Sequence, residues 1–290
     1  MIISDNFKDY KLLDAGDKEK LESWKGYILR RPDPMALWPK TKPELWDNID
    51  AYYHRSNSGG GYWQYINKVP ESWTVNYKNL TFKVSPTNFK HTGLFPEQAA
   101  NWDLIHELIN GKKNIKVLNM FGYTGAASMV ASSAGASEVV HLDASKGINE
   151  WAKENMRLSN LQDNTIRFIV DDALKFSARE IRRERKYDGI IMDPPSYGRG
   201  PDNELFKFED KINPLIENCL TLLSNNPLFL IINTYTTGYS PMVMYNTIKR
   251  HLEIKGLKAN IEVDEIGIKI DESDYILPCG QSTRITNFKK

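Results

Sequence analysis

The sequence predicts an α/β protein with a mostly parallel sheet, and three observations support this prediction. From residue 86 onward, short apolar runs alternate with amphipathic stretches at helical spacing. Several apolar runs end in a glycine or proline turn, as expected for buried parallel strands that lead into helices. Near the C-terminus, two strand-like runs follow each other with no helix between them, which predicts antiparallel pairing at a sheet edge.

The elements of this region are predicted from their hydrophobic period. The apolar runs rich in Val, Ile and Leu are expected to be strands that are covered on both faces. The stretches between them place apolar residues on one helical face, which predicts helices in right-handed crossovers. In chain order we expect helix 95–110, strand 115–120, helix 125–134, strand 138–142, helix 146–159, strand 165–170, helix 173–184, strand 187–193, helix 208–224, strand 227–233, helix 241–254, and strands 260–270 and 282–288.

The first 85 residues differ in composition and predict a small β-rich domain (1–85) ahead of the larger domain (86–290). Its aromatic residues leave two interpretations open: an RNA-binding platform that stacks bases beside cationic side chains, or the hydrophobic core of a small domain. For any single tryptophan we favour the core, and for the whole module a role in substrate binding. The residues concerned are Trp24, Trp38, Trp46, Trp63 and Trp73, with Lys25, Arg30, Arg31, Lys40 and Arg55.

Composition excludes several classes of protein. With 290 residues, 41% of them hydrophobic, and a net charge of +1, the chain has the make-up of an ordinary soluble protein and no global charge that demands nucleic acid. No apolar run is long enough to span a bilayer, and the N-terminus lacks a secretion signal, so we expect a cytoplasmic protein. We expect it to be a monomer or a homodimer. Cys219 and Cys279 cannot form a disulfide framework, and no Cys/His cluster predicts a metal site.

The segment 115–125, IKVLNMFGYTG, predicts a ligand-binding turn between a buried strand and a helix. Gly122 and Gly125 would let a ligand approach the backbone, and the free amides of the helix that begins near Ala126 would point at it. Asp143 ends the next apolar run, close to the spacing of about twenty residues at which an acid reaches a pair of ribose hydroxyls.

What this turn lacks indicates which cofactor it holds. It has neither the GxGxxG pattern of dinucleotide sites nor the GK[ST] of phosphate loops, so pyrophosphate is not the expected ligand. S-adenosylmethionine needs a ribose acid and a backbone turn but no phosphate cradle, which fits the residues present. A later strand, 187–193, ends in Asp193-Pro194-Pro195, a rigid loop that would present a carboxylate and fixed carbonyls to a ligand.

Four motifs in this order, NMFGYTG, HLDAS, VDDAL and MDPPSYGRG, resemble those of bacterial 23S ribosomal RNA methyltransferases, which include cytosine-5 and guanine-N7 enzymes. The resemblance covers residues 86–290, and HTGLFPEQ at 91–98 is similar to the family's element before the first strand. It implies a class I methyltransferase (Rossmann-like) fold with a seven-stranded, mostly parallel sheet and an antiparallel terminal strand. It also implies S-adenosylmethionine as cofactor and RNA, in particular large-subunit ribosomal RNA, as partner.

The resemblance further implies which residues form the site. Asp193 and Pro194 would face the methyl group and its acceptor, and Pro195 and Tyr197 complete the expected catalytic set. The expected cofactor contacts are Phe95, Gln98, Asn119, Phe121, Gly122, Gly125, Asp143, Ser145, Asp172, Ala173 and Asp193.

Several of these residues keep two interpretations. Asp171 and Asp172 end the third predicted strand, where an acid either meets the adenine amino group or caps the following helix, and the resemblance favours the cofactor for Asp172. The basic run at 179–186 is expected to be a solvated face. Two interpretations are open for Tyr197 and Arg199. Tyr197 could stack on a flipped base while Arg199 binds the phosphate of that nucleotide, or both could be ordinary surface residues.

The cysteines predict the acceptor atom. Methylation of cytosine C5 requires a cysteine that first adds to the ring. The segment 231–238, where the cytosine branch of the family carries that cysteine, has none. We therefore expect a base nitrogen as acceptor, and Ser196 in place of the tyrosine of DPPY favours guanine N7 over an exocyclic amine. The alternatives are a methyltransferase of proteins or small molecules, and a non-catalytic protein that binds the cofactor or RNA.

Overall fold

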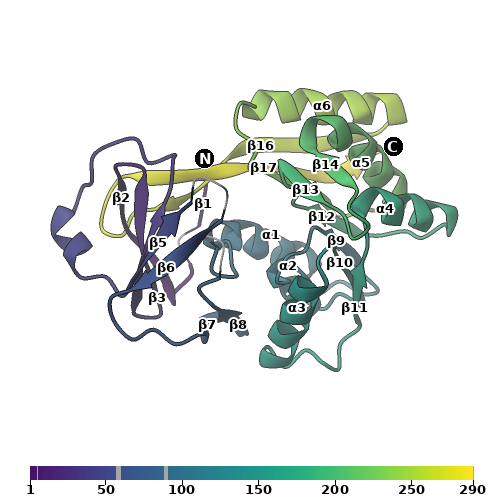
Figure 1. Cartoon of the computed structure of the whole chain (residues 1–290). Helices are drawn as coiled ribbons and strands as arrows, with labels where there is room; N and C mark the ends of the chain where they lie inside the picture. Colours follow the sequence, from purple (N-terminus) through teal and green to yellow (C-terminus); the bar gives the residue numbers. More distant parts are fainter. Residues whose placement is uncertain (5, 57–59, 88–90, 290) are drawn as a thin grey trace. The chain divides into compact units, whose positions relative to one another are not determined.

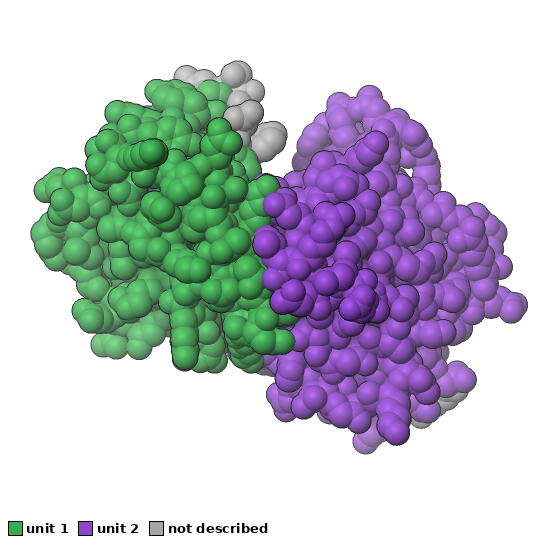
Figure 2. Space-filling model, turned by 90° about the horizontal axis from the view of Figure 1, so that it is seen from below, with its two compact units in different colours: residues 1–100, 266–279 green, residues 101–265, 280–290 purple. Residues whose placement is uncertain are grey.

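The computed structural model describes residues 1–4, 6–56, 60–87 and 91–289. The chain forms two compact units, which Figure 2 shows in different colours. Unit 1 comprises residues 1–100 and 266–279, and unit 2 comprises residues 101–265 and 280–290. The predicted domain ranges 1–85 and 86–290 divide the chain differently and stay a prediction.

Unit 1 consists of β-strands, short 3-10 helices and loops. Its five-stranded sheet has the order β2-β3-β4-β5-β6, in which β4 and β5 pair in parallel and the other neighbours antiparallel. β7 and β8 form a separate hairpin, and β1 pairs in parallel with residues 266–268. The elements are β1 (Ile2–Ser4), β2 (Tyr10–Gly16), β3 (Glu19–Trp24), β4 (Tyr27–Pro32), η1 (Pro43–Asp47), β5 (Ala51–Arg55), β6 (Gly61–Tyr65), β7 (Trp73–Tyr77), β8 (Leu80–Val84) and η2 (Pro96–Gln98).

Two tryptophans of unit 1 belong to its core. Trp24 is fully buried and packs edge-on against Tyr10, with ring centroids 4.6 Å apart. Trp46 is also buried, and its indole N–H donates to Asp14 over 2.8 Å. This burial confirms the core interpretation for these two residues. Tyr62 and Tyr65, on strand β6, are more exposed than either of them.

Unit 2 contains the predicted alternation of helices and strands. Its sheet has the order β16-β17-β15-β12-β9-β10-β11, with β1 beyond β16. The neighbours from β15 to β11 pair in parallel, and β17 runs antiparallel to β15. In Figure 1, helices α4, α5 and α6 lie on one face of the sheet and α1, α2 and α3 on the other.

The elements of this region are α1 (Ala99–Ile109), β9 (Lys116–Met120), α2 (Ala126–Ser133), β10 (Glu138–Asp143), α3 (Lys146–Leu158), β11 (Ile166–Val170), α4 (Ala173–Arg182), β12 (Gly189–Met192), β13 (Tyr197–Arg199), β14 (Leu205–Lys207), α5 (Phe208–Leu222), β15 (Phe229–Thr234), α6 (Pro241–Lys255), β16 (Lys258–Lys269) and β17 (Ile276–Lys289).

The predicted fold class is confirmed: a large, mostly parallel sheet with an antiparallel strand, together with an N-terminal β-rich region. Two details differ from the prediction. The prediction that the two C-terminal strands form the sheet edge is wrong, because the three-residue strand β1 pairs outside β16. The hairpin of β13 and β14 was also not predicted, because its strands are too short for a hydrophobic period to appear.

The core of unit 2 fixes the strand ends at which the predicted site residues begin. Leu118 and Met120 on β9 and Ile190 and Met192 on β12 are fully buried, and they pack in one cluster with helix α5, including Ile216. Full burial of such a side chain stabilises the fold by about 1.5–3 kcal/mol. The residues that follow Met120 and Met192 are therefore presented from a rigid base.

Candidate cofactor and active site

The strand order changes direction between β9 and β12. The chain continues from β9 to its neighbour β10 on one side and later returns to β12 on the other side. In open α/β sheets, ligands bind at such a switch point, outside the carboxyl ends of the strands. Met120 pairs with Met192, and the backbone N–H of Asp193 donates to the Met120 carbonyl over 3.3 Å. The topology thus brings the turn after β9 and the Asp193 loop together.

The turn after β9 holds its backbone in the left-handed region. Phe121 has φ 57°, Tyr123 has φ 50° and Gly125 has φ 89°. The amide of Gly122 donates to the Leu142 carbonyl over 2.9 Å, which ties the turn to the end of β10. A left-handed conformation of a residue with a side chain is unfavourable and persists where the surrounding structure imposes it, often at ligand sites. The backbone geometry therefore fits the predicted ligand-binding turn.

The two glycines of the turn are required for different reasons. A Cβ at Gly122 would lie 2.4 Å from a ring carbon of His141, so only glycine fits above this ring. Gly125 has a left-handed φ and forms the N-cap of α2. The space beside Gly122 is thus filled by His141. A contact between Gly122 and the cofactor stays a prediction.

Below the turn lies a buried polar network. The Asn119 side-chain amide donates to Ser128 Oγ over 2.9 Å, and Ser128 Oγ lies 2.9 Å from His141 Nδ1. Burial lowers the pKa of His141 to about 4, which keeps the imidazole neutral at pH 7. Asn119, expected to touch the cofactor, is only 2% exposed and uses its side chain to support the turn. A contact between Asn119 and the cofactor stays a prediction.

Asp143, at the end of β10, accepts two backbone hydrogen bonds with its carboxylate. One oxygen accepts from Tyr123 N over 3.0 Å and the other from Ser145 N over 2.9 Å. Burial raises the pKa of Asp143, and these two donors act in the opposite direction. Each carboxylate oxygen has a second lone pair, so both can still accept from a hydroxyl group. Asp143 therefore keeps acceptor capacity beyond its two backbone donors, and its contact with a ribose stays a prediction.

Two expected cofactor residues are helix N-caps. Ser145 Oγ accepts from Ile148 N over 3.3 Å at the start of α3, and Asp172 accepts from Lys175 N over 2.9 Å at the start of α4. Such a cap stabilises a helix by roughly 1 kcal/mol. The capping interpretation of Asp172 is thus correct, and its contact with adenine stays a prediction, as does that of the buried Ala173, the first residue of α4.

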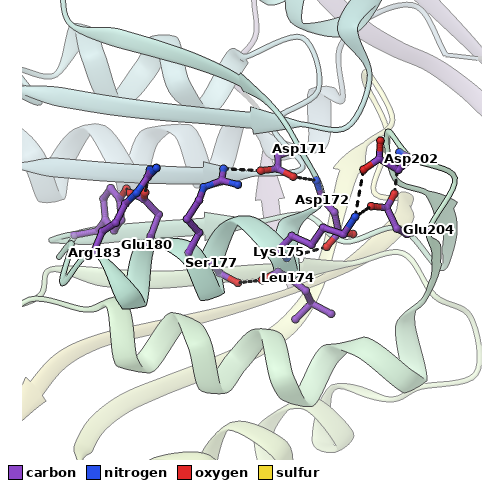
Figure 3. Close-up of polar contacts among 11 residues, drawn as sticks. Asp171, Asp172, Leu174, Lys175, Ser177, Glu180, Arg183, Asp202 and Glu204 are labelled. Atoms are coloured by element: carbon purple, nitrogen blue, oxygen red, sulfur yellow. Dashed lines mark hydrogen bonds and ion pairs between the residues drawn. The ribbon is translucent and has the colours of Figure 1, made fainter.

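Asp171 is bound within the protein. Its carboxylate accepts from the Asp172 backbone over 2.8 Å (Figure 3). It also accepts from the Arg179 guanidinium over 2.5 Å. Within the predicted basic face, Arg185 likewise pairs with Glu138 over 2.7 Å. Both arginines therefore serve local ion pairs, and the pair of Asp171 with Arg179 ties the residues between β11 and α4 to that helix.

Phe95 and Gln98 belong to unit 1. The ring of Phe95 lies 5.0 Å from that of His91, and Gln98 is 6% exposed at the end of the 3-10 helix η2. Their expected contact with the cofactor stays a prediction.

The acceptor side of the site follows β12. Pro194 is buried, Pro195 is half-buried, and Tyr197 is 57% exposed. Ser196 is exposed, and its hydroxyl lies 2.9 Å from that of Thr236 in the loop after β15. The loops after β12 and β15 are thereby joined beside Asp193.

An unpredicted hairpin continues from this loop. Strands β13 and β14 pair antiparallel, with Tyr197 opposite Lys207, and Phe206 is 6% exposed. The ring of Phe206 packs edge-on against Phe121 of the cofactor turn, with centroids 5.3 Å apart. The run Gly200-Pro201-Asp202-Asn203 is a turn signal that could have indicated the hairpin.

Neither cysteine has the environment of a reactive nucleophile. Cys219 is fully buried in α5, with its sulfur 3.9 Å from the Met192 sulfur in the core, and burial raises its pKa to about 12. Burial also raises the pKa of Cys279, which lies in unit 1, well above its ordinary value. The thiolate is the nucleophilic form, so both residues are held in the unreactive form at neutral pH.

Within the residues that the structure describes, no group of three or more His, Cys, Asp or Glu side chains could hold a metal ion. In the same residues, no helix has the length and apolar character needed to cross a membrane.

The fold and the switch-point site define the class of protein. A mostly parallel sheet with an antiparallel strand, a glycine turn after its central strand and an acid at the end of the next strand form a class I methyltransferase. The chain belongs to the S-adenosylmethionine-dependent methyltransferase family, whose model matches residues 50–239. Its cofactor is S-adenosylmethionine.

Solved structures share this fold. The S-adenosylmethionine-dependent methyltransferase from Agrobacterium tumefaciens matches with a TM-score of 0.93 and 33% identity, over 98% of this chain and 92% of that one. SMU.776, solved in complex with SAH, matches with a TM-score of 0.74 and 20% identity, over 98% of this chain and 76% of that one.

Two curated relatives are ribosomal RNA methyltransferases. The ribosomal RNA large subunit methyltransferase K/L of Syntrophotalea carbinolica is 31% identical over 156 residues, 54% of this chain and 21% of that protein. The ribosomal RNA large subunit methyltransferase K of Neisseria meningitidis is 23% identical over 227 residues, 75% of this chain and 63% of that protein. The chain thus spans about a fifth of the K/L relative and less than two thirds of the K relative.

Proposed function

We propose that this methyltransferase acts on large-subunit ribosomal RNA and transfers the methyl group to a base nitrogen, with guanine preferred over cytosine C5. The names of the relatives support the RNA substrate. The observation that carries the choice of acceptor is the burial of Cys219 in the core and the unreactive state of both thiols. Without a cysteine to add to the ring, C5 of cytosine is not nucleophilic enough. A ribosomal RNA substrate also supports our expectation of a cytoplasmic enzyme.

The residues of the switch point fit S-adenosylmethionine. Asp143 would accept from the ribose hydroxyls with the lone pairs that its two backbone donors leave available. The left-handed turn from Phe121 to Gly125 would face the amino-acid portion, and Asp172 the adenine. Bound there, the sulfonium supplies a methyl group that is already activated for transfer.

The remaining task of the protein is to position the acceptor. A ring nitrogen such as guanine N7 carries a lone pair and needs no proton removed, so no general base is required. The rigid Asp193-Pro194-Pro195 loop would hold the base in line with the methyl carbon and exclude water. Tyr197, exposed next to this loop, would stack on the target base after it leaves its own stack.

Transfer of label identifies the substrate class. The protein is incubated with S-adenosylmethionine labelled in the methyl group and, separately, with ribosomal RNA, ribosomal protein and cell metabolites. We expect label in RNA, and a loss of at least tenfold with Asp193→Ala. Label in the protein or metabolite fraction would contradict the RNA substrate. Absence of label in all three, with the cofactor bound, would favour a non-catalytic binding protein.

A further inference from the structure

The hairpin of β13 and β14 has two faces of different character. Its register pairs Tyr197 with Lys207 and Arg199 with Leu205, and side chains alternate between the faces of a strand. These four residues therefore share one face, and all four are exposed. Gly198 and the buried Phe206 lie on the other face. The outer face thus carries one exposed aromatic ring and two cations.

Three contacts hold this hairpin in place. The ring of Phe206 packs against Phe121 on the cofactor turn, and the backbone N–H of Phe208 donates to the Ser196 carbonyl over 3.1 Å. At its tip, Glu204 and Asp202 meet Lys175 of α4, as Figure 3 shows. A surface fixed in this way loses little conformational entropy when it binds a ligand.

The same contacts set the charge of the outer face. Lys175 pairs with both acids of the hairpin tip, Asp202 and Glu204. Arg199 donates to the neutral amide oxygen of Asn203 over 2.9 Å and so keeps its full charge. Lys207 adds a second cation on the same face. Lys175 therefore offsets one of the two negative charges at the tip, and with Arg199 and Lys207 on the outer face the positive charges of this group exceed the negative ones by one.

We propose that the outer face of this hairpin, formed by Tyr197, Arg199, Leu205 and Lys207, docks the single-stranded RNA segment that carries the target base. The proposal rests on the proposed function and extends it to the nucleotides beside the target. Exposed aromatic rings stack on bases of any sequence, and arginine and lysine bind phosphates, the combination that single-stranded RNA requires.

The position of the hairpin in the chain supports this occupant. Tyr197 follows the rigid Asp193-Pro194-Pro195 loop directly, so the aromatic end of the face begins where the acceptor base is expected. The cations lie further along the same face and would contact the flanking phosphates. The packing of Phe206 on Phe121 further connects this RNA surface to the cofactor turn.

Binding of RNA without turnover tests the proposal. The probe is a fluorescently labelled single-stranded RNA of about ten nucleotides, a typical site size, measured by anisotropy with the full chain in the presence of SAH. Arg199→Gln combined with Lys207→Gln should weaken binding at least fivefold. It should also lower the slope of log affinity against log salt by about 1.4, or about 0.7 for each single-strand phosphate contact. Lys249→Gln, an exposed cation on α6, is the matched control and should change affinity less than twofold.

The aromatic contribution is tested separately. Tyr197→Ala should weaken binding about 5- to 100-fold, whereas Tyr197→Phe, which keeps the ring, should bind like the wild type. Thermal unfolding gives the folded fraction of each variant, so that the binding affinities are compared at equal folded fraction.

The outcomes separate this proposal from the proposed function. If the wild type binds the RNA and the paired variant binds it with equal affinity and salt slope, the hairpin proposal is overturned and the proposed function is not. If the wild type binds no RNA, both are overturned. A labelled poly-glutamate peptide that binds more tightly than RNA, and loses affinity in the paired variant, would assign the face to an acidic protein partner instead.

Discussion

Replacement of Asp143 by alanine separates the two roles that the structure gives this carboxylate. The side chain accepts from Tyr123 N and Ser145 N, and it has lone pairs left for a ribose. A hydrogen bond to a charged group contributes about 1.5–3 kcal/mol, so loss of the ribose contact should raise the cofactor Kd about 10- to 150-fold. The two amides lie in separate turns, that of the half-buried Tyr123 after β9 and that of the exposed Ser145 after β10, so we expect a smaller loss of stability, about 1–2 kcal/mol.

Titration calorimetry with S-adenosylmethionine measures the first effect, and denaturant unfolding without cofactor measures the second. Asp163→Ala is the matched control, because it removes an exposed acid of the same charge from the turn before β11. This control should leave both quantities nearly unchanged. An Asp143→Ala variant that is less stable but binds the cofactor with unchanged Kd at equal folded fraction would refute the ribose role and leave Asp143 as a purely structural residue.

Four further predictions follow from the site. Gly122→Ala places a Cβ against the His141 ring and should cost about 1–3 kcal/mol of stability, and a double-mutant cycle with His141→Ala should recover most of this loss. The double variant Cys219→Ser, Cys279→Ser should keep its methyl-transfer activity at equal folded fraction and lose on the order of 1 kcal/mol of stability. A folded but inactive double variant would restore cytosine C5 as the acceptor. Burial lowers the pKa of His141 to about 4, so on acidification the unfolded chain protonates this imidazole before the folded chain does. The free energy of unfolding should therefore fall by roughly 3 kcal/mol between pH 6.5 and pH 4. Unfolding free energies of the wild type and of His141→Gln, measured across this pH range, check this prediction. Asp193→Ala should lower the rate of transfer by at least tenfold with a nearly unchanged cofactor Kd, and an equal loss of both would assign Asp193 to the cofactor.

The fold was predictable from the sequence because its signals are local. The strands β9, β10, β11, β12 and β15 are rich in Val, Ile, Leu, Met and Phe, and turn residues end them where the pattern predicts. The hairpin of β13 and β14 gave no such signal, because each strand has three residues and its fixed position depends on Phe121 and Lys175, which lie far away in the sequence.

The site was predictable as a set of positions and less so as a set of roles. Gly122 and Asn119 stand where the motif predicts a cofactor turn, but their immediate partners are His141 and Ser128, which only the folded chain brings close. The role of Asp172 could not be predicted for a different reason. An acid after a strand and before a helix has the same local pattern whether it caps the helix or binds adenine.

The identity of the methylated atom tests the central claim most directly. Ribosomal RNA that has received labelled methyl groups from this enzyme is digested to nucleosides, and the methylated nucleoside is identified by mass spectrometry. We expect a guanosine methylated on a nitrogen, and at least tenfold less label with Asp193→Ala. A 5-methylcytidine product, together with a covalent adduct on RNA that carries 5-fluorocytosine, would contradict this expectation, because the buried Cys219 or the half-buried Cys279 would then have to be the nucleophile.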